Sequence, residues 1–189
     1  MNMKALLLLF ILSFLFIFQN HPKAQDLTPV GFYENKGEIS YHRFDVHKGN
    51  IYWPLGKKGL VVFNAEQPGN LERIKYYHNY EIRSYRKVYG SANAIELKGD
   101  TAFLANGELG FEILNISRPV NPVLLGRYYR HQAISEFKIV GKKAVLGLSE
   151  NGAEIIDFSN VKDITLASRN NMDDFQTTDI EILENYVYV

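Results

Sequence analysis

The sequence GFEILN at residues 110–115 belongs to a pattern that occurs three times in this chain. Related hexapeptides are GLVVFN at residues 59–64 and GAEIID at residues 152–157. Each begins with glycine, continues through mostly apolar residues and ends in Asn or Asp. Because they recur at long and similar intervals, the hexapeptides indicate a repeat architecture in which every unit contributes the same short segment.

The similarity extends to the N-terminal side of each hexapeptide and superposes without gaps. Two apolar segments precede it in each copy: residues 44–46 and 51–53, residues 95–97 and 102–104, and residues 137–139 and 144–146. A fourth copy begins at residues 180–182. The second and third copies are shifted by 42 residues, whereas the first and second are shifted by 51. The first copy therefore carries an insertion of nine residues.

Within one unit, the residue pattern is typical of short β-strands. Ile95 and Leu97 flank Glu96, and residues 137–139 repeat this alternation, which is the period of a half-buried strand. Gly, Asn and Pro follow at short spacing, as turns require. A last strand is expected over residues 123–129. The sequence therefore predicts an all-β fold with four short strands in a unit of about 42 residues, the composition of a β-propeller blade.

The predicted units cover almost all of the chain after its N-terminal segment. They are residues 41–78, 92–130 and 134–171, with the start of another at 177–189. Residues 28–33 echo residues 122–128 and predict a leading outer strand. Since propellers close with about 4–8 blades, three blades, a leading strand and part of a fourth make an incomplete ring. We interpret the chain as the N-terminal part of a longer protein that supplies the remaining blades. The alternatives are a short chain that closes by oligomerising and a decaying gene fragment.

The third strand of the unit resembles a known repeat. Residues 60–64 read LVVFN and are similar to the LVIVD repeat, and residues 113–119 and 155–160 resemble its usual continuation. The resemblance covers residues 28–189. LVIVD-repeat proteins are β-propellers that are commonly exported or surface-attached in bacteria and archaea. The resemblance therefore implies a fold and a location, but no catalytic residues.

The polar residue that ends each hexapeptide is predicted to have a structural role. The residues are Asn64, Asn115 and Asp157, where the LVIVD repeat itself has Asp. A short polar side chain at a strand end accepts hydrogen bonds from the N–H groups of the following turn. The glycines that begin the hexapeptides, Gly59, Gly110 and Gly152, are assigned to turns as well. Contact of the polar residues with a ligand or ion is the alternative.

Residues 1–25 predict a signal peptide. Lys4 precedes an apolar run over residues 5–18, and polarity returns at Gln19. This run is shorter than the roughly 20 residues of a membrane-spanning helix and fits the core of an export signal. Ala24 or Gln25 is the expected last residue of the leader. We expect an exported protein, periplasmic, secreted or on the cell surface, with no transmembrane span after cleavage. An uncleaved N-terminal anchor is the alternative.

Composition excludes several functions. The chain has 189 residues, of which 46% are apolar, so it can form a packed core. Lys and Arg number 21, as do Asp and Glu, which argues against a general nucleic-acid binder. Cysteine is absent, which excludes disulfides and thiolate metal sites. The histidines lack the spacing of zinc ligands, and no catalytic or phosphate-binding motif occurs. We therefore predict no catalytic residues, no metal and no cofactor.

The insertion holds the first candidate site. It falls within residues 76–89, which include Tyr80, Arg83, Tyr85 and Arg86. Tyrosine offers a flat amphipathic ring, and arginine pairs with carboxylate or phosphate groups. Because aromatic residues and arginine on a loop suit a binding surface, these four residues are candidate contacts for an unknown protein or carbohydrate ligand. The alternative is that the tyrosines pack on the outer strand and the charges stay solvated.

A second candidate lies in the turns before the hexapeptides. Lys57, Glu108 and Glu150 occupy equivalent positions in successive units. Two carboxylates on neighbouring blades could form an acid/base pair or bind a hard cation. The alternative is that a Glu next to Asn-Gly is ordinary turn composition.

The sequence therefore favours an exported propeller that acts as a binding or interaction scaffold. The alternative is a propeller that houses a polysaccharide hydrolase or lyase, with its active site partly in the missing blades.

Overall fold

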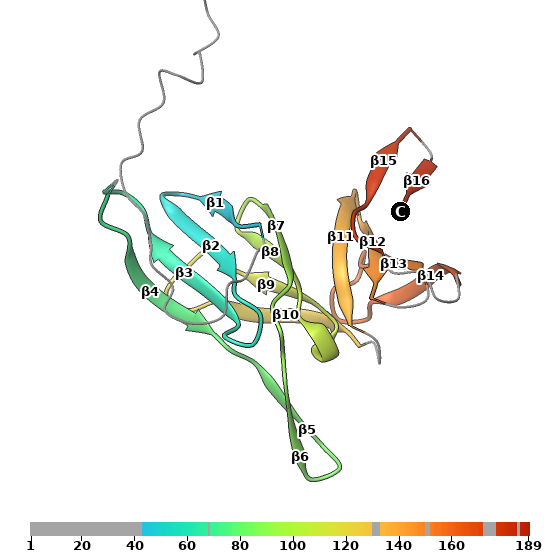
Figure 1. The fold of residues 1–189 in the computed structure, drawn as a ribbon, viewed down its shortest axis with the longest axis horizontal. Coiled ribbons are helices and arrows are strands. Elements are labelled where there is room, and N and C mark those ends of the chain that lie inside the picture. Colours follow the sequence, from blue (N-terminus) through green and yellow to red (C-terminus); the bar gives the residue numbers. More distant parts are fainter. Residues whose placement is uncertain (1–42, 68, 130–132, 150–151, 172–176, 185) are drawn as a thin grey trace, which may run out of the picture. The chain divides into compact units, whose positions relative to one another are not determined.

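The computed structural model describes residues 43–189, with gaps at 68, 130–132, 150–151, 172–176 and 185 (Figure 1). The predicted signal peptide and the predicted leading strand lie within residues 1–42, outside the described residues.

Twelve of the strands form three four-stranded antiparallel sheets, each built from consecutive strands. The first contains β1 (Asp45–His47), β2 (Asn50–Pro54), β3 (Leu60–Asn64) and β4 (Glu72–Tyr77). The second contains β7 (Ala94–Lys98), β8 (Thr101–Ala105), β9 (Phe111–Asn115) and β10 (Val123–Tyr128). The third contains β11 (Ile134–Val140), β12 (Lys143–Leu148), β13 (Ala153–Asp157) and β14 (Thr165–Asn170). The prediction of an all-β chain with four strands per unit is confirmed for these three units.

The remaining strands form two hairpins. They are β5 (Tyr80–Arg83) with β6 (Arg86–Tyr89), and β15 (Glu181–Leu183) with β16 (Tyr186–Tyr188). A short 3-10 helix, η2 (Gly107–Leu109), lies between β8 and β9. The described residues thus contain almost no helix, and closure of the sheets into a ring stays a prediction.

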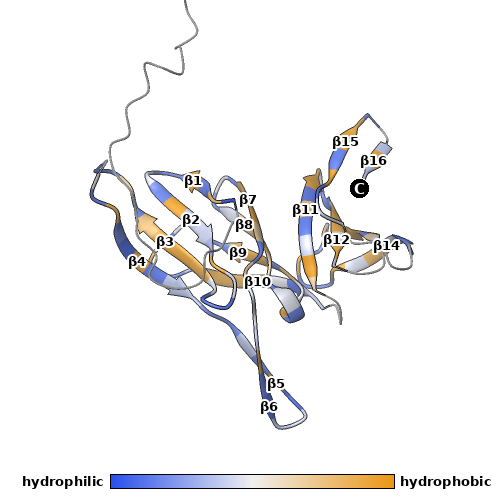
Figure 2. Cartoon of the chain, in the orientation of Figure 1, coloured by the Kyte–Doolittle hydropathy of each residue, from blue (hydrophilic) through white to orange (hydrophobic). Residues whose placement is uncertain are grey.

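The central strands are apolar on both faces because each face is covered. In β8, Ala102 and Leu104 pack with residues of the first sheet, whereas Phe103 and Ala105 pack with residues of the third. Successive side chains of a strand point to opposite faces, so alternate residues of β8 serve two different cores. Figure 2 shows the apolar colour concentrated in such central strands, while much of β4 and β5 is hydrophilic.

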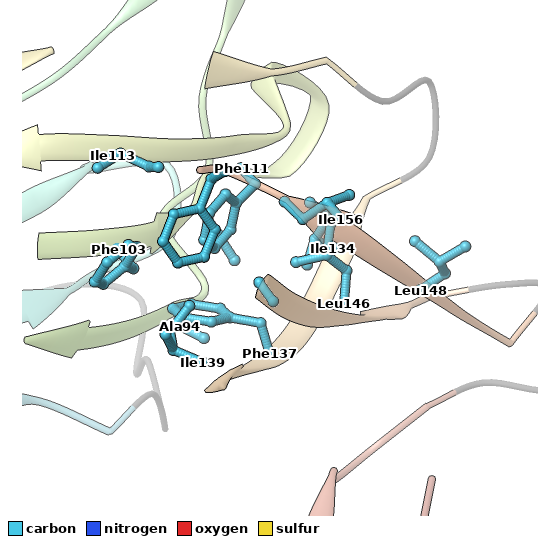
Figure 3. Packing of buried hydrophobic residues seen from close by; sticks show 13 residues of the cluster. Ala94, Phe103, Phe111, Ile113, Ile134, Phe137, Ile139, Leu146, Leu148 and Ile156 are labelled. Atoms are coloured by element: carbon cyan, nitrogen blue, oxygen red, sulfur yellow. The ribbon is translucent and has the colours of Figure 1, made fainter. Parts of the chain in front are cut away.

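Phenylalanine rings fill the core between the second and third sheets (Figure 3). The Phe111 ring meets the Phe137 ring edge-on, with centroids 5.1 Å apart, and lies 6.1 Å from the Phe103 ring. Burying one such side chain contributes about 1.5–3 kcal/mol, and an aromatic pair adds about 0.5–1.5 kcal/mol. These contacts hold the two sheets face to face.

Side-chain hydrogen bonds to the backbone link the first strands of successive sheets. Oδ2 of Asp45 in β1 accepts a 2.8 Å bond from the backbone N–H of Leu97 in β7. Oε2 of Glu96 in β7 accepts a 3.1 Å bond from the backbone N–H of Ile139 in β11. Asp45 and Glu96 are equivalent residues of the repeat. In the first and second units, the carboxylate of the first strand therefore accepts a hydrogen bond from the backbone of the next unit's first strand.

A turn with the same geometry follows the third strand of every sheet. In each, the side-chain oxygen of the last strand residue accepts a hydrogen bond from the backbone N–H two residues later. The bonds are Asn64 with Glu66 (2.9 Å), Asn115 with Ser117 (2.8 Å) and Asp157 with Ser159 (2.8 Å). The bonds from Ser159 lower the pKa of Asp157. Gly59, Gly110 and Gly152 have φ angles of 80°, 84° and 80°, a conformation that favours glycine.

Candidate ligand-binding site

The insertion of the first unit, expected to be a loop, instead contains the hairpin β5–β6. Tyr80 pairs with Tyr89 and Arg83 pairs with Arg86, which leaves a two-residue turn. Each strand satisfies the backbone groups of the other, and successive side chains point to opposite faces of the hairpin. The insertion is therefore an ordered strand pair that connects the first sheet to the second (Figure 1).

The tip of this hairpin is strained. Ser84 and Tyr85 have φ angles of 47° and 66°, as a two-residue type I′ turn requires. Asn-Gly is the usual sequence there, because the left-handed conformation costs other L-residues about 1–2 kcal/mol each. Tyr85 is fully exposed, so burial of its ring does not offset the strain. Backbone strain of this kind clusters at binding sites, where the side chain has a function.

The tyrosines of the hairpin are exposed rather than packed on the outer strand. Tyr80 and Tyr89 are 48% and 52% exposed, and their ring centroids lie 5.9 Å apart. The Tyr89 ring also stacks on His78, with centroids 5.4 Å apart and planes 11° from parallel. Nζ of Lys87 lies 4.8 Å from the centroid of the Tyr80 ring. Three rings and one ammonium group therefore form a continuous row.

Arg83 fastens the hairpin to the second sheet. Its Nε donates a 2.8 Å hydrogen bond to Oε2 of Glu81, and its Nη2 donates a 3.1 Å bond to the backbone oxygen of Glu108. The guanidinium carbon also lies 5.8 Å from the centroid of the Tyr129 ring. Two of the predicted site residues, Arg83 and Glu108, are thus brought together, but through the backbone of Glu108. Arg86 lies exposed beside the turn.

An open cavity of about 620 Å³ lies at the base of the hairpin. Its lining includes Lys57, His78, Tyr89, Ser91, Asn93 and Glu108. The connection between β2 and β3 and the connection between the first two sheets meet there, because Gly56 and Ala92 exchange backbone hydrogen bonds of 2.8 and 2.9 Å. Lys57 and Glu108, predicted to be equivalent, both reach this cavity. Glu150 lies outside the described residues.

A buried glutamate network was not predicted. Glu112 in β9 is completely buried, and Arg127, its cross-strand neighbour in β10, donates to its Oε1 through Nε at 2.8 Å and also through Nη2. Tyr77 of the first sheet donates to Oε2 at 3.3 Å, and Asn106 donates to the same oxygen at 2.9 Å. Burial and the Glu112 carboxylate raise the pKa of Tyr77. Burial lowers the pKa of Arg127, but Glu112 more than offsets this, so the pKa is raised.

The same arrangement recurs one unit later. Glu154 is also completely buried, and it accepts a 2.7 Å bond from Arg169 and a 3.3 Å bond from Tyr128 of the preceding sheet. The sequence contained a signal for this buried Glu–Arg pair. In the second and third units, a Glu interrupts the apolar hexapeptide and an Arg follows 15 residues later. In the first unit the paired positions are Val61 and Tyr76, which carry no charge. These carboxylates are engaged in joining units.

A second hollow, of about 660 Å³, lies along the first strands of the sheets. Glu136 and Lys138 of β11 line it together with Phe44. Burial raises the pKa of Glu136. Two more of its acids, Asp45 and Glu96, are the residues that bind the backbone of the next unit, and Glu181 lies 3.6 Å from Nζ of Lys138.

None of the described residues forms a cluster of three or more acidic or histidine side chains that suits a metal ion. In the same part of the chain, no helix has the length and apolar character needed to cross a membrane.

Consecutive four-stranded antiparallel sheets that repeat along the chain define an all-β repeat protein. The repeat has a known family: residues 89–129, which contain the whole second sheet, match the family model described as the LVIVD repeat. The resemblance expected from the sequence is therefore confirmed for these residues.

Solved structures are similar in fold alone. The computationally designed Ika4 protein shares 12% sequence identity with this chain at a TM-score of 0.55, with 82% of this chain and 87% of that chain covered. The computationally designed Ika8 protein shares 10% identity at a TM-score of 0.46, with 76% of this chain and 53% of that chain covered. None of the curated proteins compared with the chain matches it.

Proposed function

We propose that this chain is an exported binding module whose ligand contacts lie on the hairpin β5–β6 and in the cavity at its base. The observation that carries the proposal is the strained tip of the hairpin, which holds Tyr85 fully exposed. A turn selected for stability would have Asn-Gly at this place. A tyrosine that costs stability and gains no burial is explained by a contact with another molecule.

The surroundings of the hairpin support a binding function. Aromatic and cationic side chains are exposed together on it, which is the composition that distinguishes interface residues from other surface residues. Arg83 ties the hairpin to the second sheet, so the contact residues are held on a rigid support. Such preorganisation lowers the entropy lost on binding.

A glycan and peptide array tests the proposal. The full chain is compared with a variant in which Tyr80, Tyr85 and Tyr89 are replaced by Ser. We expect the parent to bind a subset of the probes and the triple variant to lose those signals with its melting temperature unchanged. The proposal is overturned if the parent binds no probe, or if the variant binds as the parent does.

We further propose that the three sheets are consecutive blades of a β-propeller. Both faces of the second sheet are buried against its neighbours, which is how blades stack around an axis. Electron microscopy of the complete protein should give ring-shaped class averages. Elongated, unclosed particles would contradict the propeller.

Export through cleavage of residues 1–25 is part of the same proposal. It rests on the short apolar run after Lys4. The full chain is produced in a bacterial host with a C-terminal tag, and the mass of the tagged product is measured. A mass that begins at residue 25 or 26 is expected, and an intact N-terminus in the cytoplasmic fraction would refute export.

A further inference from the structure

The hairpin β5–β6 has two chemically different faces. Side chains alternate along each strand, and the pairing of Tyr80 with Tyr89 and of Ile82 with Lys87 sets these four residues on one face. All four are exposed, Ile82 to 66%. The other face carries Arg83, whose contacts with Glu108 and Tyr129 direct it toward the second sheet. The face with Tyr80 and Tyr89 is therefore the one open to a ligand.

The rings on this open face continue into the cavity. Tyr89 and His78 both line the cavity, and their nearly parallel rings are followed by that of Tyr80. Successive centroids are 5.4 and 5.9 Å apart. A continuous row of aromatic rings offers an extended amphipathic surface to a ligand made of repeating ring units.

The charge of this surface is positive. The carboxylate of Glu81 is engaged by Arg83. Within the described part of the chain, Lys87 on the open face forms no ion pair, and Lys57 adds a second cation at the cavity. Among the described residues that line the cavity, Glu108 alone carries a carboxylate. A surface with this surplus attracts anionic groups by charge complementarity.

We infer that the ligand is an acidic polysaccharide, a chain of sugar rings that carry carboxylates. The C–H groups on the apolar face of a pyranose ring pack on the negatively polarised face of an aromatic ring. The carboxylates pair with the ammonium group of Lys87. Tyr85 packs against the sugar unit that lies at the tip of the hairpin. The balanced charge of the whole chain disfavours nucleic acid as the anionic partner.

This inference rests on the proposed binding function, so its test must separate the two. Three probes are titrated onto the full chain by calorimetry: galacturonic acid oligosaccharides, galactose oligosaccharides of the same length, and polyglutamate. The first probe has sugar rings and charge, the second has rings alone, and the third has charge alone. We expect the galacturonate to bind at least about tenfold more tightly than either of the others. Its affinity should fall as salt is added, because exposed charges are screened.

Variants then assign the two chemistries to residues. Lys87→Gln should weaken galacturonate binding severalfold and leave the affinity for the neutral oligosaccharide unchanged. Tyr89→Ser should weaken both. The matched controls are Lys142→Gln and Tyr186→Ser, which remove an exposed lysine and an exposed tyrosine elsewhere. Neither control should change the affinity.

The outcomes separate the two proposals. If the neutral oligosaccharide binds as tightly as the galacturonate, and the triple tyrosine variant loses both, the binding function stands and the acidic ligand is wrong. If polyglutamate binds as tightly as galacturonate, the sugar rings are not recognised and the inference fails. Absence of binding to all three probes overturns the acidic-polysaccharide inference, while the array decides the binding function. Galacturonate binding that survives in the triple variant overturns both for this surface.

Discussion

The hydroxyl of Tyr77 donates a hydrogen bond of 3.3 Å to Oε2 of Glu112, which connects the last strand of one sheet to the third strand of the next. Tyr128 and Glu154 form the same bond, also of 3.3 Å, one unit later. Each carboxylate is fully buried and paired with an arginine of its own sheet. The junctions on either side of the second sheet therefore share one polar connection inside an otherwise apolar core.

Loss of Glu112 should destabilise the protein strongly. Glu112→Ala leaves Arg127, whose side chain is 8% exposed, as an uncompensated buried charge, and breaking such a pair costs about 3–5 kcal/mol. Glu154→Ala should cost less, because the Arg169 side chain is 37% exposed and water replaces its partner. Urea denaturation measures both.

An apolar replacement of the charged pair and its tyrosine provides the control for this prediction. Tyr77→Phe, Glu112→Val and Arg127→Met together remove both buried charges and should recover part of the lost stability, while Asn106 still loses its acceptor. The exposed Glu108→Ala should change little. Equal losses for Glu112→Ala and Glu108→Ala would contradict the role assigned to the buried carboxylate.

Tyr85 at the tip of the hairpin should lower the free energy of unfolding and raise the affinity for the ligand. Tyr85→Gly relieves the left-handed strain and should raise the free energy of unfolding by about 1 kcal/mol, while galacturonate affinity falls. Differential scanning calorimetry and titration calorimetry measure the two effects. Gly99→Ala, at another turn with positive φ, should act in the opposite direction on stability alone. A destabilised Tyr85→Gly variant would show that the turn is not strained.

The stability of the first junction should depend on pH through Asp100. Hydrogen bonds from Lys48 and His47 lower the pKa of Asp100. A lowered pKa means that ionised Asp100 stabilises the folded state above the unfolded-state pKa of about 3.9, and this contribution is lost as pH falls through the folded-state pKa. Asp100→Asn should therefore be less stable than the parent at pH 7 and similar to it at pH 2.

Denaturation at a series of pH values between those two limits checks this prediction. Asp163→Asn removes a carboxylate in the third unit, away from Asp100, and controls for the change in net charge. A difference between parent and Asp100→Asn that stays constant across the series would refute the assignment.

The turn after each third strand should depend on its polar side chain. Asn115→Ala removes the acceptor for the backbone N–H of Ser117 and should cost about 1 kcal/mol. Asn115→Asp keeps the acceptor and should be close to neutral, since Asp157 performs the same role in the third unit. Thermal denaturation distinguishes the two. A loss of the same size for both substitutions would show that the hydrogen bond is not the cause.

Much of the fold could be read from the sequence, because the relevant signals are local and repeated. The alternation around Glu96 and the hexapeptide that ends at Asn115 reflect strand and turn geometry within a few residues. The hairpin β5–β6 was missed because it occurs once, without the Asn-Gly that marks such turns. The tyrosines of the candidate site could be found by composition. The exposure of these tyrosines and the attachment of the hairpin through Arg83 could not be predicted from composition, because both depend on tertiary contacts.

By itself, the sequence determined the repeat, the strands of each unit and the turns that end its third strands, since these depend on backbone preferences and on the period of apolar residues. Only the tertiary structure decided which residues of different units meet. Tyr77 and Glu112 are 35 residues apart, and their partnership depends on how two sheets stack. The same holds for the row from His78 to Tyr80, which exists because strand pairing and packing, rather than sequence neighbourhood, set side chains beside one another.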